Sequence, residues 1–279
     1  MQKFDSYIIV SDLDGTFFGE KASVLKNNLE AIQYFKENGG KFTFATGRDY
    51  KILEHQFPQL LNIPNCPGIL CNGVYLYDFE KKITSKSLEI DKIELLNAIE
   101  VIKEAVPEST FRISFPDGFL CSKENQLPFP VEQKTFFDPI LTWDSLKNQL
   151  DVPWYKLVYC YVKSPNTENW IEKVKEVVQK LDLKNIDTVP SAGHLLEFLP
   201  KGTGKGLSLF DLRDLYPNRK IICVGDYDND LSMLKAADIA ACPENAIDPV
   251  KNICSIHLCH HREGCIADLI YKLESSIKK

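Results

Sequence analysis

Residues 7–16 have the sequence YIIVSDLDGT, in which a continuous apolar run meets two acids and a glycine. A short run without polar alternation is typical of a strand that is buried on both faces, and such strands belong to parallel sheets. Two later runs, at 41–45 and 221–224, also lead directly into polar or acidic residues. We therefore expect a parallel sheet whose strands end in chemically active side chains.

The segments around these runs alternate between helix and strand patterns. Apolar spacing predicts helices at 24–38 and 50–57, and a third strand at 68–71. From residue 201 the same alternation resumes, with strands at 221–224, 239–241 and 253–258 and helices at 204–215, 231–237 and 266–273. This order is typical of the α/β class, and it predicts a Rossmann-like, doubly wound parallel sheet.

The middle of the chain has a different pattern. A hairpin is expected at 75–77 and 83–87, and a proline-rich stretch occupies 128–139. Strands are expected at 110–115, 119–122, 155–162 and 194–199, with helices at 93–106 and 167–181. We therefore predict a core domain of residues 1–83 and 194–279, interrupted by an α+β domain of residues 84–193.

Composition indicates which partners the protein can bind and in which cellular compartment it is expected. The 279 residues carry a net charge of -6, which leaves no basic surface for nucleic acid or an anionic membrane. No apolar run approaches the ~20 residues that span a bilayer. Nine cysteines without a secretory signal favour reduced thiols in a cytoplasm. We predict a cytoplasmic protein without a nucleic-acid or membrane partner, and no protein partner is predicted.

Ligands of open α/β sheets bind beyond the carboxyl ends of the strands. The polar residues expected at that edge are Asp12, Asp14, Thr46, Arg48, Asn72, Asp226, Asp228, Asn229 and Asp230. Several carboxylates at one edge repel one another unless a hard cation such as Mg²⁺ lies between them. Because Mg²⁺ in proteins is commonly shared between carboxylates and substrate phosphate, this edge predicts a phosphoryl-transfer site.

Four motifs in this order resemble those of the haloacid dehalogenase superfamily. They are DLDGT at 12–16, TGR at 46–48, Lys205, and GDYDND at 225–230. An insertion between the second and third motifs resembles the Cof-type sugar-phosphate phosphatases, which carry a large α+β cap of the C2 type. The resemblance implies a Mg²⁺-dependent phosphatase that acts on a small phosphorylated metabolite, with a sugar phosphate as the expected substrate. The cap is expected to exclude water and to recognise the rest of the substrate.

The resemblance also implies roles for individual residues. Asp12 is the expected nucleophile, which forms an aspartyl phosphate, and Asp14 is the general acid and base. Lys205 neutralises Asp12 and the phosphoryl group. The Asp12 carboxylate, the Asp14 backbone carbonyl and Asp226 are the expected Mg²⁺ ligands, and Asp230 orients metal-bound water.

Other residues are expected to bind phosphate or substrate. The Thr46 hydroxyl and the Gly47 amide would contact the phosphoryl oxygens, although Thr-Gly alone is an ordinary helix cap. Arg48 contacts the body of the substrate or pairs with a core carboxylate. Asn72 is a direct ligand or part of a plain turn. Asn229 should position phosphate or Asp12.

Two local patterns have competing interpretations. Lys201 lies four residues before Lys205, but the family pattern favours the lysine that begins the helix. The glycine-rich stretch 202–206 is not a P-loop, because Leu199 and Gly206 occupy positions where that motif needs Gly and Ser or Thr.

Asp228 is expected to be an exposed helix cap, and Asn245-Ala246 resembles a family turn.

A group of cysteines and histidines near the C-terminus lies outside this account. Its members are Cys254, His257, Cys259, His260, His261 and Cys265. Such soft ligands could bind zinc, but their spacing matches no standard zinc site. We favour a strand followed by a polar loop.

Two alternative functions remain open at this point. A phosphomutase of the same superfamily shares the aspartyl phosphate, and a non-catalytic phosphometabolite-binding protein would be expected to lack Asp12 or Asp14, both of which are present. In the inserted domain, Phe115, Phe119, Trp154 and Tyr161 are candidates for substrate recognition or for the core of that domain.

Overall fold

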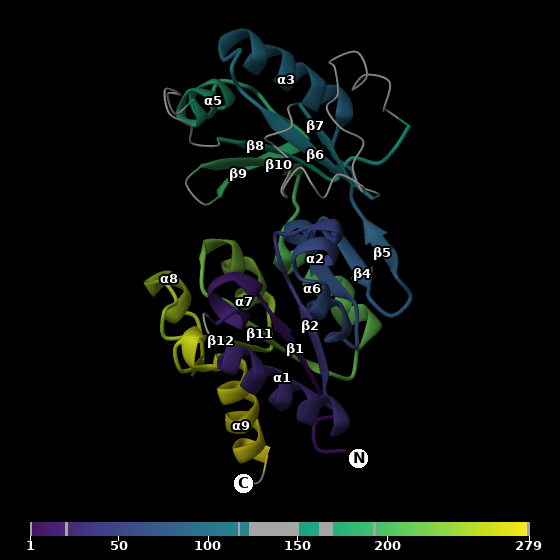
Figure 1. Cartoon of the computed structure of the whole chain (residues 1–279), viewed down its shortest axis with the longest axis vertical. Helices are drawn as coiled ribbons and strands as arrows, with labels where there is room; N and C mark the ends of the chain where they lie inside the picture. Colours follow the sequence, from purple (N-terminus) through teal and green to yellow (C-terminus); the bar gives the residue numbers. More distant parts are fainter. Residues whose placement is uncertain are drawn as a thin grey trace. The chain divides into compact units, whose positions relative to one another are not determined.

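A computed structural model describes residues 2–19, 22–116, 118–122, 151–161, 170–191 and 194–277. The chain forms two compact units (Figure 1): a core unit of Met1–Lys86 and Gly204–Lys279, and an inserted unit of Ser87–Thr203. The sequence pattern placed the boundaries after residues 83 and 193. The second boundary lies later because β10 (Leu195–Pro200) pairs with two strands of the inserted unit.

The core unit is built on a five-stranded sheet of order β13-β12-β11-β1-β2. Its strands are β1 (Tyr7–Ser11), β2 (Lys41–Phe44), β11 (Lys220–Val224), β12 (Ile239–Cys242) and β13 (Ile256–His257). All four neighbouring pairs are parallel. The predicted α/β class and parallel sheet are therefore confirmed, with the YIIVS strand between β11 and β2.

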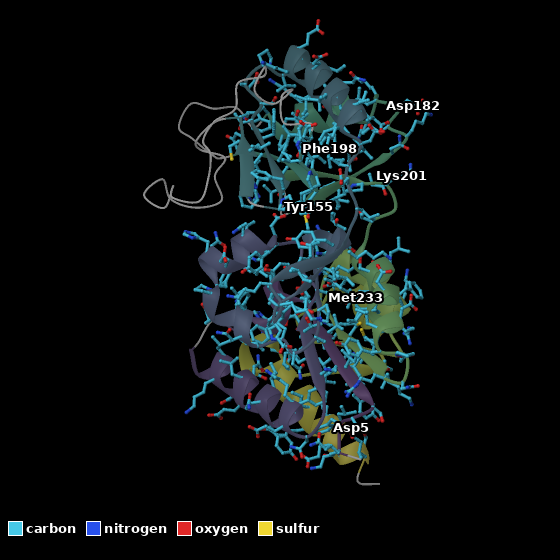
Figure 2. All side chains as sticks on the ribbon, turned by 90° about the vertical axis from the view of Figure 1, so that its right-hand side faces the viewer. Asp5, Tyr155, Asp182, Phe198, Lys201 and Met233 are labelled. Carbon is cyan, nitrogen blue, oxygen red and sulfur yellow. The ribbon has the colours of Figure 1, made fainter. Side chains whose placement is uncertain are left out.

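Helices pack on the core sheet in two pairs (Figure 1). One pair is α1 (Ala22–Glu37) with α9 (Cys265–Ile277), and the other is α6 (Lys205–Leu215) with α7 (Leu231–Ala236). Ile8 and Val10 of β1 pack with apolar residues of the second helix pair, among them Met233 (Figure 2). Ile9, which alternates with them and so points to the other face of the sheet, is also fully buried. Burial on both faces explains the continuous apolar run.

Smaller elements extend the core unit. The helix α2 (Tyr50–Gln56) precedes β3 (Gly68–Leu70), which lies beside the chain after β2 through a parallel bridge between Ala45 and Ile69. A second sheet has the order β3-β4-β5, with β4 (Tyr75–Asp78) and β5 (Ile83–Ser87) at the positions of the expected hairpin. One helix, α8 (Asp248–Lys251), was not predicted, because four residues are too few to show a helical period.

The inserted unit contains a sheet of order β7-β6-β8-β10-β9. Its other elements are β6 (Phe111–Phe115), β7 (Gly118–Cys121), β8 (Lys156–Cys160), β9 (Ile186–Ser191), α3 (Lys92–Ala105) and α5 (Ile171–Val178). All four neighbouring strand pairs in this sheet are antiparallel. Trp154 and Phe198 lie in its apolar core, and Phe115 and Tyr161 pack against that core (Figure 2 labels Phe198). These aromatic side chains therefore have structural roles in the inserted unit.

One strand of the inserted unit, β9, was not predicted. The β9 segment contains Pro190, which cannot donate a hydrogen bond to a neighbouring strand. It lies at the edge of the sheet, where β10 is its one partner among the described strands. The proline-rich stretch 128–139 lies outside the described residues. Across the described ranges, no helix is long and apolar enough to span a bilayer.

Candidate active site

The site is assembled where three neighbouring parallel strands end. Asp12 directly follows β1, and its backbone amide donates to the Val224 carbonyl at 2.9 Å. The register pairs Ser11 with Val224 of β11 and with Phe44 of β2. The residues that follow these strands therefore lie along one edge of the sheet, as predicted.

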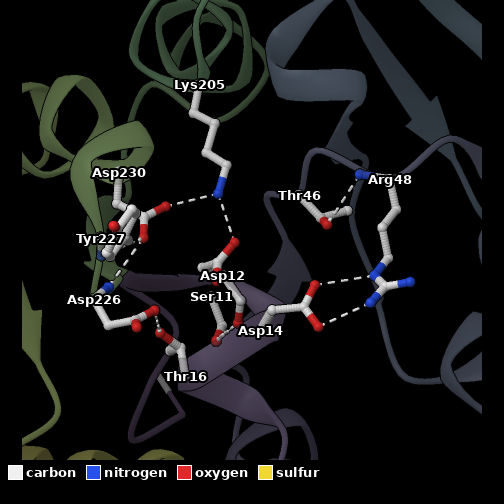
Figure 3. A network of polar contacts seen from close by, with 10 residues as sticks. All are labelled: Ser11, Asp12, Asp14, Thr16, Thr46, Arg48, Lys205, Asp226, Tyr227 and Asp230. Carbon is white, nitrogen blue, oxygen red and sulfur yellow. Dashed lines mark hydrogen bonds and ion pairs between the residues drawn. The ribbon is translucent and has the colours of Figure 1, made fainter. Parts of the chain in front are cut away.

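Lys205 joins two of the acids at this edge (Figure 3). Its Nζ lies 2.5 Å from Oδ1 of Asp12 and 2.6 Å from Oδ1 of Asp230. Lys205 is only 1% exposed and Asp230 is fully buried. Burial by itself would lower the pKa of Lys205, but the charges and hydrogen bonds of Asp12 and Asp230 raise it above its ordinary value. The amine therefore stays charged.

Asp226 lies beside this pair of acids. Its Oδ1 accepts a hydrogen bond from the Thr16 hydroxyl at 2.9 Å. One oxygen of Asp230 accepts from the backbone amides of Asp226 and Tyr227, at 2.9 Å and 3.2 Å (Figure 3). Ligand atoms of Asp12, Asp226 and Asp230 all lie within 4.8 Å of one another. The predicted convergence of three acids from two strand ends is thus present.

The cluster contains three acids and one neighbouring cation, Lys205. Burial and the charge of Asp230 raise the pKa of Asp12 to about 8 and that of Asp226 to about 6. Among the described cations, Lys205 is the one that forms ion pairs with this cluster, and its partners are Asp12 and Asp230. Clustered carboxylate oxygens with excess negative charge fit a hard divalent cation such as Mg²⁺.

The turn that carries Asp14 packs against Asp226. It forms the short element η1 (Leu13–Phe17), in which Gly15 has a φ of 82°. A β-carbon at Gly15 would collide with the Asp226 carboxylate. Glycine is therefore required for two reasons, the left-handed backbone and the close approach of the acid.

Arg48 pairs with Asp14. Its Nε and Nη2 donate to the two carboxylate oxygens at 3.0 Å and 2.8 Å (Figure 3), and its guanidinium stacks 4.7 Å from the centre of the Phe57 ring. The Asp14 side chain is 61% exposed. Arg48 was expected either to contact the body of the substrate or to pair with a core carboxylate. In the structure it pairs with a carboxylate, but this acid, Asp14, is exposed and does not belong to the core. A contact with substrate stays a prediction.

Thr46, Gly47 and Asn72 are close together. The Thr46 carbonyl accepts from the Asn72 amide at 3.0 Å, and the Thr46 hydroxyl accepts from the Arg48 amide at 3.2 Å. A β-carbon on Gly47 would approach the Asn72 side-chain oxygen to 2.9 Å. Asn72 has a left-handed φ of 57°, as a turn residue does. Their contact with phosphate stays a prediction.

Other predicted residues lie apart from the acids. Asp228 and Asn229 are exposed in the short turn η6 (Asp228–Asp230), and no hydrogen bond joins the Asn229 side chain to Asp12 in the described structure. Lys201 belongs to the inserted unit, where its Nζ lies 3.9 Å from Asp187 (Figure 2 labels Lys201). Of the two lysines, only Lys205 contacts Asp12.

The cysteines and histidines of 254–265 do not converge on a metal position. Within the described ranges, the one group of three or more clustered metal-ligating side chains is Asp12, Asp226 and Asp230. The contact between Thr16 and Asp226 was not predicted, because 210 positions separate the two residues in the sequence. The relevant signal was its place in the DLDGT motif.

The fold and the site together define a class, an α/β enzyme with a lysine-paired nucleophile candidate and an acidic cluster at the carboxyl ends of parallel strands. The sequence model of the haloacid dehalogenase-like hydrolases matches residues 9–270. The chain therefore belongs to that family, which confirms the resemblance seen in the four motifs.

Named relatives match the chain over nearly its whole length. It is 26% identical to pyridoxal phosphate phosphatase YbhA of Escherichia coli, over 95% of this chain and 97% of that protein. It is also 26% identical to 5-amino-6-(5-phospho-D-ribitylamino)uracil phosphatase YitU of Bacillus subtilis, over 94% of this chain and 95% of that protein.

A solved structure supports the same fold. A haloacid dehalogenase-like hydrolase from Bacteroides thetaiotaomicron superposes with a TM-score of 0.78 at 21% identity, covering 96% of this chain and 99% of that one. With the family and the named relatives, the enzyme class is that of a phosphoric monoester hydrolase.

Proposed function

We propose that the chain is a Mg²⁺-dependent phosphatase that hydrolyses the phosphate monoester of a small metabolite, with a sugar phosphate as the expected substrate. The observation that carries this proposal is the buried Asp12–Lys205 pair at the end of β1, beside Asp226 and Asp230. A carboxylate next to a lysine and a cation site, whose positive charges both favour its ionised form, is suited to attack phosphorus.

In the first half-reaction Asp12 attacks the phosphoryl group. Lys205 contacts Oδ1 of Asp12, so Oδ2 is the oxygen assigned to the attack. The bond from this oxygen to phosphorus forms as the ester bond to the leaving alkoxide breaks. Asp14 donates a proton to that alkoxide, and an aspartyl phosphate remains on Asp12.

In the second half-reaction water attacks the aspartyl phosphate. Asp14, now ionised, accepts the proton of the water, inorganic phosphate leaves, and the Asp12 carboxylate is restored. Arg48 donates to both oxygens of the ionised Asp14, so it orients this group as the base. Held by Asp12, Asp226 and the Asp14 carbonyl, Mg²⁺ would offset the charge of the phosphoryl oxygens.

The names of the relatives indicate which esters to test. Pyridoxal phosphate and 5-amino-6-(5-phospho-D-ribitylamino)uracil, the compounds in those names, both carry phosphate on a primary alcohol. Sugar phosphates with a terminal phosphate share this feature. A primary alkoxide is a strongly basic leaving group, and its departure needs the acid that we assign to Asp14.

The test measures phosphate release from a panel of primary esters: terminal sugar phosphates, pyridoxal phosphate and the phosphoribitylaminouracil, with and without Mg²⁺. We expect Mg²⁺-dependent release from at least one ester and none from the Asp12→Asn variant. A positional isomer of a sugar phosphate without free phosphate would instead identify a mutase. Tight binding of an ester without any product would identify a binding protein, and either result would overturn the proposal.

A further inference from the structure

The loop after β1 is held in place by side chains from other segments of the core unit. Four successive carbonyls, those of residues 15–18, each accept a hydrogen bond from a side chain outside the loop. The pairs are Asn245 Nδ2 to Gly15 at 2.8 Å, Cys265 Sγ to Thr16 at 3.2 Å, Asn28 Nδ2 to Phe17 at 3.1 Å, and His261 Nδ1 to Phe18 at 2.6 Å.

This loop needs such donors because its backbone is irregular. Asp14 has an extended conformation and Gly15 a left-handed one, so η1 is not a regular helix. Thr16 and Phe17 are nevertheless fully buried. A buried carbonyl without a hydrogen-bond donor costs free energy. Here side chains donate the hydrogen bonds that backbone amides would donate in a regular helix.

The donors are fixed in turn by their own contacts. Oδ1 of Asn245 accepts from the His261 amide at 3.1 Å, and Oδ1 of Asn28 accepts from the Ala267 amide at 3.1 Å. A carbonyl can only accept, so Nδ1 of His261 carries the hydrogen. Burial raises the pKa of the Cys265 thiol above its ordinary value, so the sulfur keeps the hydrogen that it donates.

These contacts give a role to part of the cysteine and histidine group that zinc binding did not explain. His261 and Cys265 direct their polar atoms at the nucleophile loop, and Asn245 belongs to the turn that the sequence singled out. His257, in the same segment, is exposed. The group therefore contains members that contact the loop and at least one that points to solvent.

The loop that these donors hold, residues 12–18, contains the residues to which we assign the reaction. It contains Asp12 and Asp14, and the Thr16 hydroxyl within it donates a hydrogen bond to Asp226. We infer that Asn245, His261 and Cys265 are positioning residues, which hold this loop so that Asp12, the Asp14 carbonyl and Asp226 can share one cation and meet the phosphoryl group. The inference rests on the proposed function.

The experiment compares three variants with the parent protein. His261→Leu removes the donor to Phe18. His261→Asn restores one, because an asparagine amide can occupy the position of Nδ1. His257→Leu is the matched control at an exposed histidine of the same segment. The measurements are the Mg²⁺ dissociation constant by calorimetry, kcat and KM for p-nitrophenyl phosphate, the melting temperature, and amide hydrogen exchange of residues 13–18.

We expect His261→Leu to weaken Mg²⁺ binding and to lower kcat by about 10–100-fold, the usual effect of losing a group that orients metal ligands. Exchange of the loop amides should accelerate while the melting temperature changes little. His261→Asn should recover most of the Mg²⁺ affinity and kcat, and His257→Leu should match the parent.

Two results would overturn the inference. One is a His261→Leu variant with parental Mg²⁺ affinity, kcat and loop exchange. The other is stoichiometric zinc in the purified protein that is lost in His261→Leu, because the group would then be a metal site. If the parent hydrolyses no ester but loop exchange still accelerates in His261→Leu, the proposed function fails and the positioning role stands.

Discussion

Lys205 is the residue on which the site depends most directly, since it contacts both Asp12 and Asp230 in a buried setting. Lys205→Ala should lower kcat by at least about 100-fold, because charge stabilisation at a reacting group is commonly worth that much. Lys201→Ala, the matched control in the inserted unit, should leave kcat unchanged. Steady-state kinetics on folded protein checks both, and equal small effects would mean that the lysine of the third motif is misassigned.

Asp14 is expected to act in both half-reactions. Asp14→Asn should slow hydrolysis of a sugar phosphate by about 10²–10⁴-fold, the usual worth of one general acid or base. An aryl ester such as p-nitrophenyl phosphate needs little acid help, so the variant should release a burst of nitrophenol and then accumulate aspartyl phosphate. Rapid-quench kinetics measures the burst. Parental rates on the sugar ester would contradict the role, as would the same burst from Asp12→Asn.

The pKa values of Asp12 and Asp226 predict how Mg²⁺ binding depends on pH. Both are raised, to about 8 and about 6, so in the metal-free protein each acid holds its proton to a higher pH than an ordinary aspartate. Mg²⁺ needs the ionised forms and must displace these protons. Its affinity should therefore fall as pH drops, by about tenfold per pH unit for each proton displaced. Calorimetry on either side of these pKa values tests this, and a constant affinity would refute it.

The residue scale also shows where prediction from sequence stops. The acids at the ends of β1 and β11 could be predicted, because parallel strands bring their carboxyl ends to one edge. The bond from Thr16 to Asp226 and the pair of Arg48 with Asp14 could not, since each joins two loops whose distance no sequence spacing reveals. Three of the four donors to residues 15–18, Asn245, His261 and Cys265, come from still farther along the chain.

At the level of elements, strands with a strong apolar pattern were predicted and marginal ones were not. The run 7–10 became β1, because helices cover both faces of its sheet. The segment 253–258 was expected to form a strand, yet β13 retains only Ile256–His257. At the edge of a sheet a strand has one neighbour, so its length depends on local turns more than on apolar burial.

The helix α3 in the inserted unit offers a test of an element boundary. Asp91 caps this helix, and its side chain accepts from the Glu94 amide at 3.0 Å. Asp91→Ala should lower the free energy of unfolding by about 1 kcal/mol, the typical worth of such a cap. Asp182→Ala, at an exposed acid of the same unit (Figure 2), is the control. Urea unfolding measures both, and equal effects would show that the cap contributes nothing.

At the level of the whole molecule, the acidic site should make activity dependent on a divalent cation. Removal of metal by a chelator should abolish phosphate release, and Mg²⁺ should restore it, because Lys205 pairs with only Asp12 and Asp230 of the three clustered acids. Zinc should restore less, since the clustered side chains offer only oxygen ligands. Phosphate release after dialysis measures this, and full turnover without metal would contradict it.

The place where the chain returns to the core unit has a consequence for how this protein can vary. Thr203 ends the inserted unit, Gly204 begins the second core segment, and Lys205 starts α6. The chain leaves the core after Lys86, which no described contact joins to the acids. Natural variation can therefore remodel the interior of the insertion while Lys205 and the acids of the core unit keep their places. The one junction that must keep its length is the last, because adding or removing a residue there would shift the lysine itself.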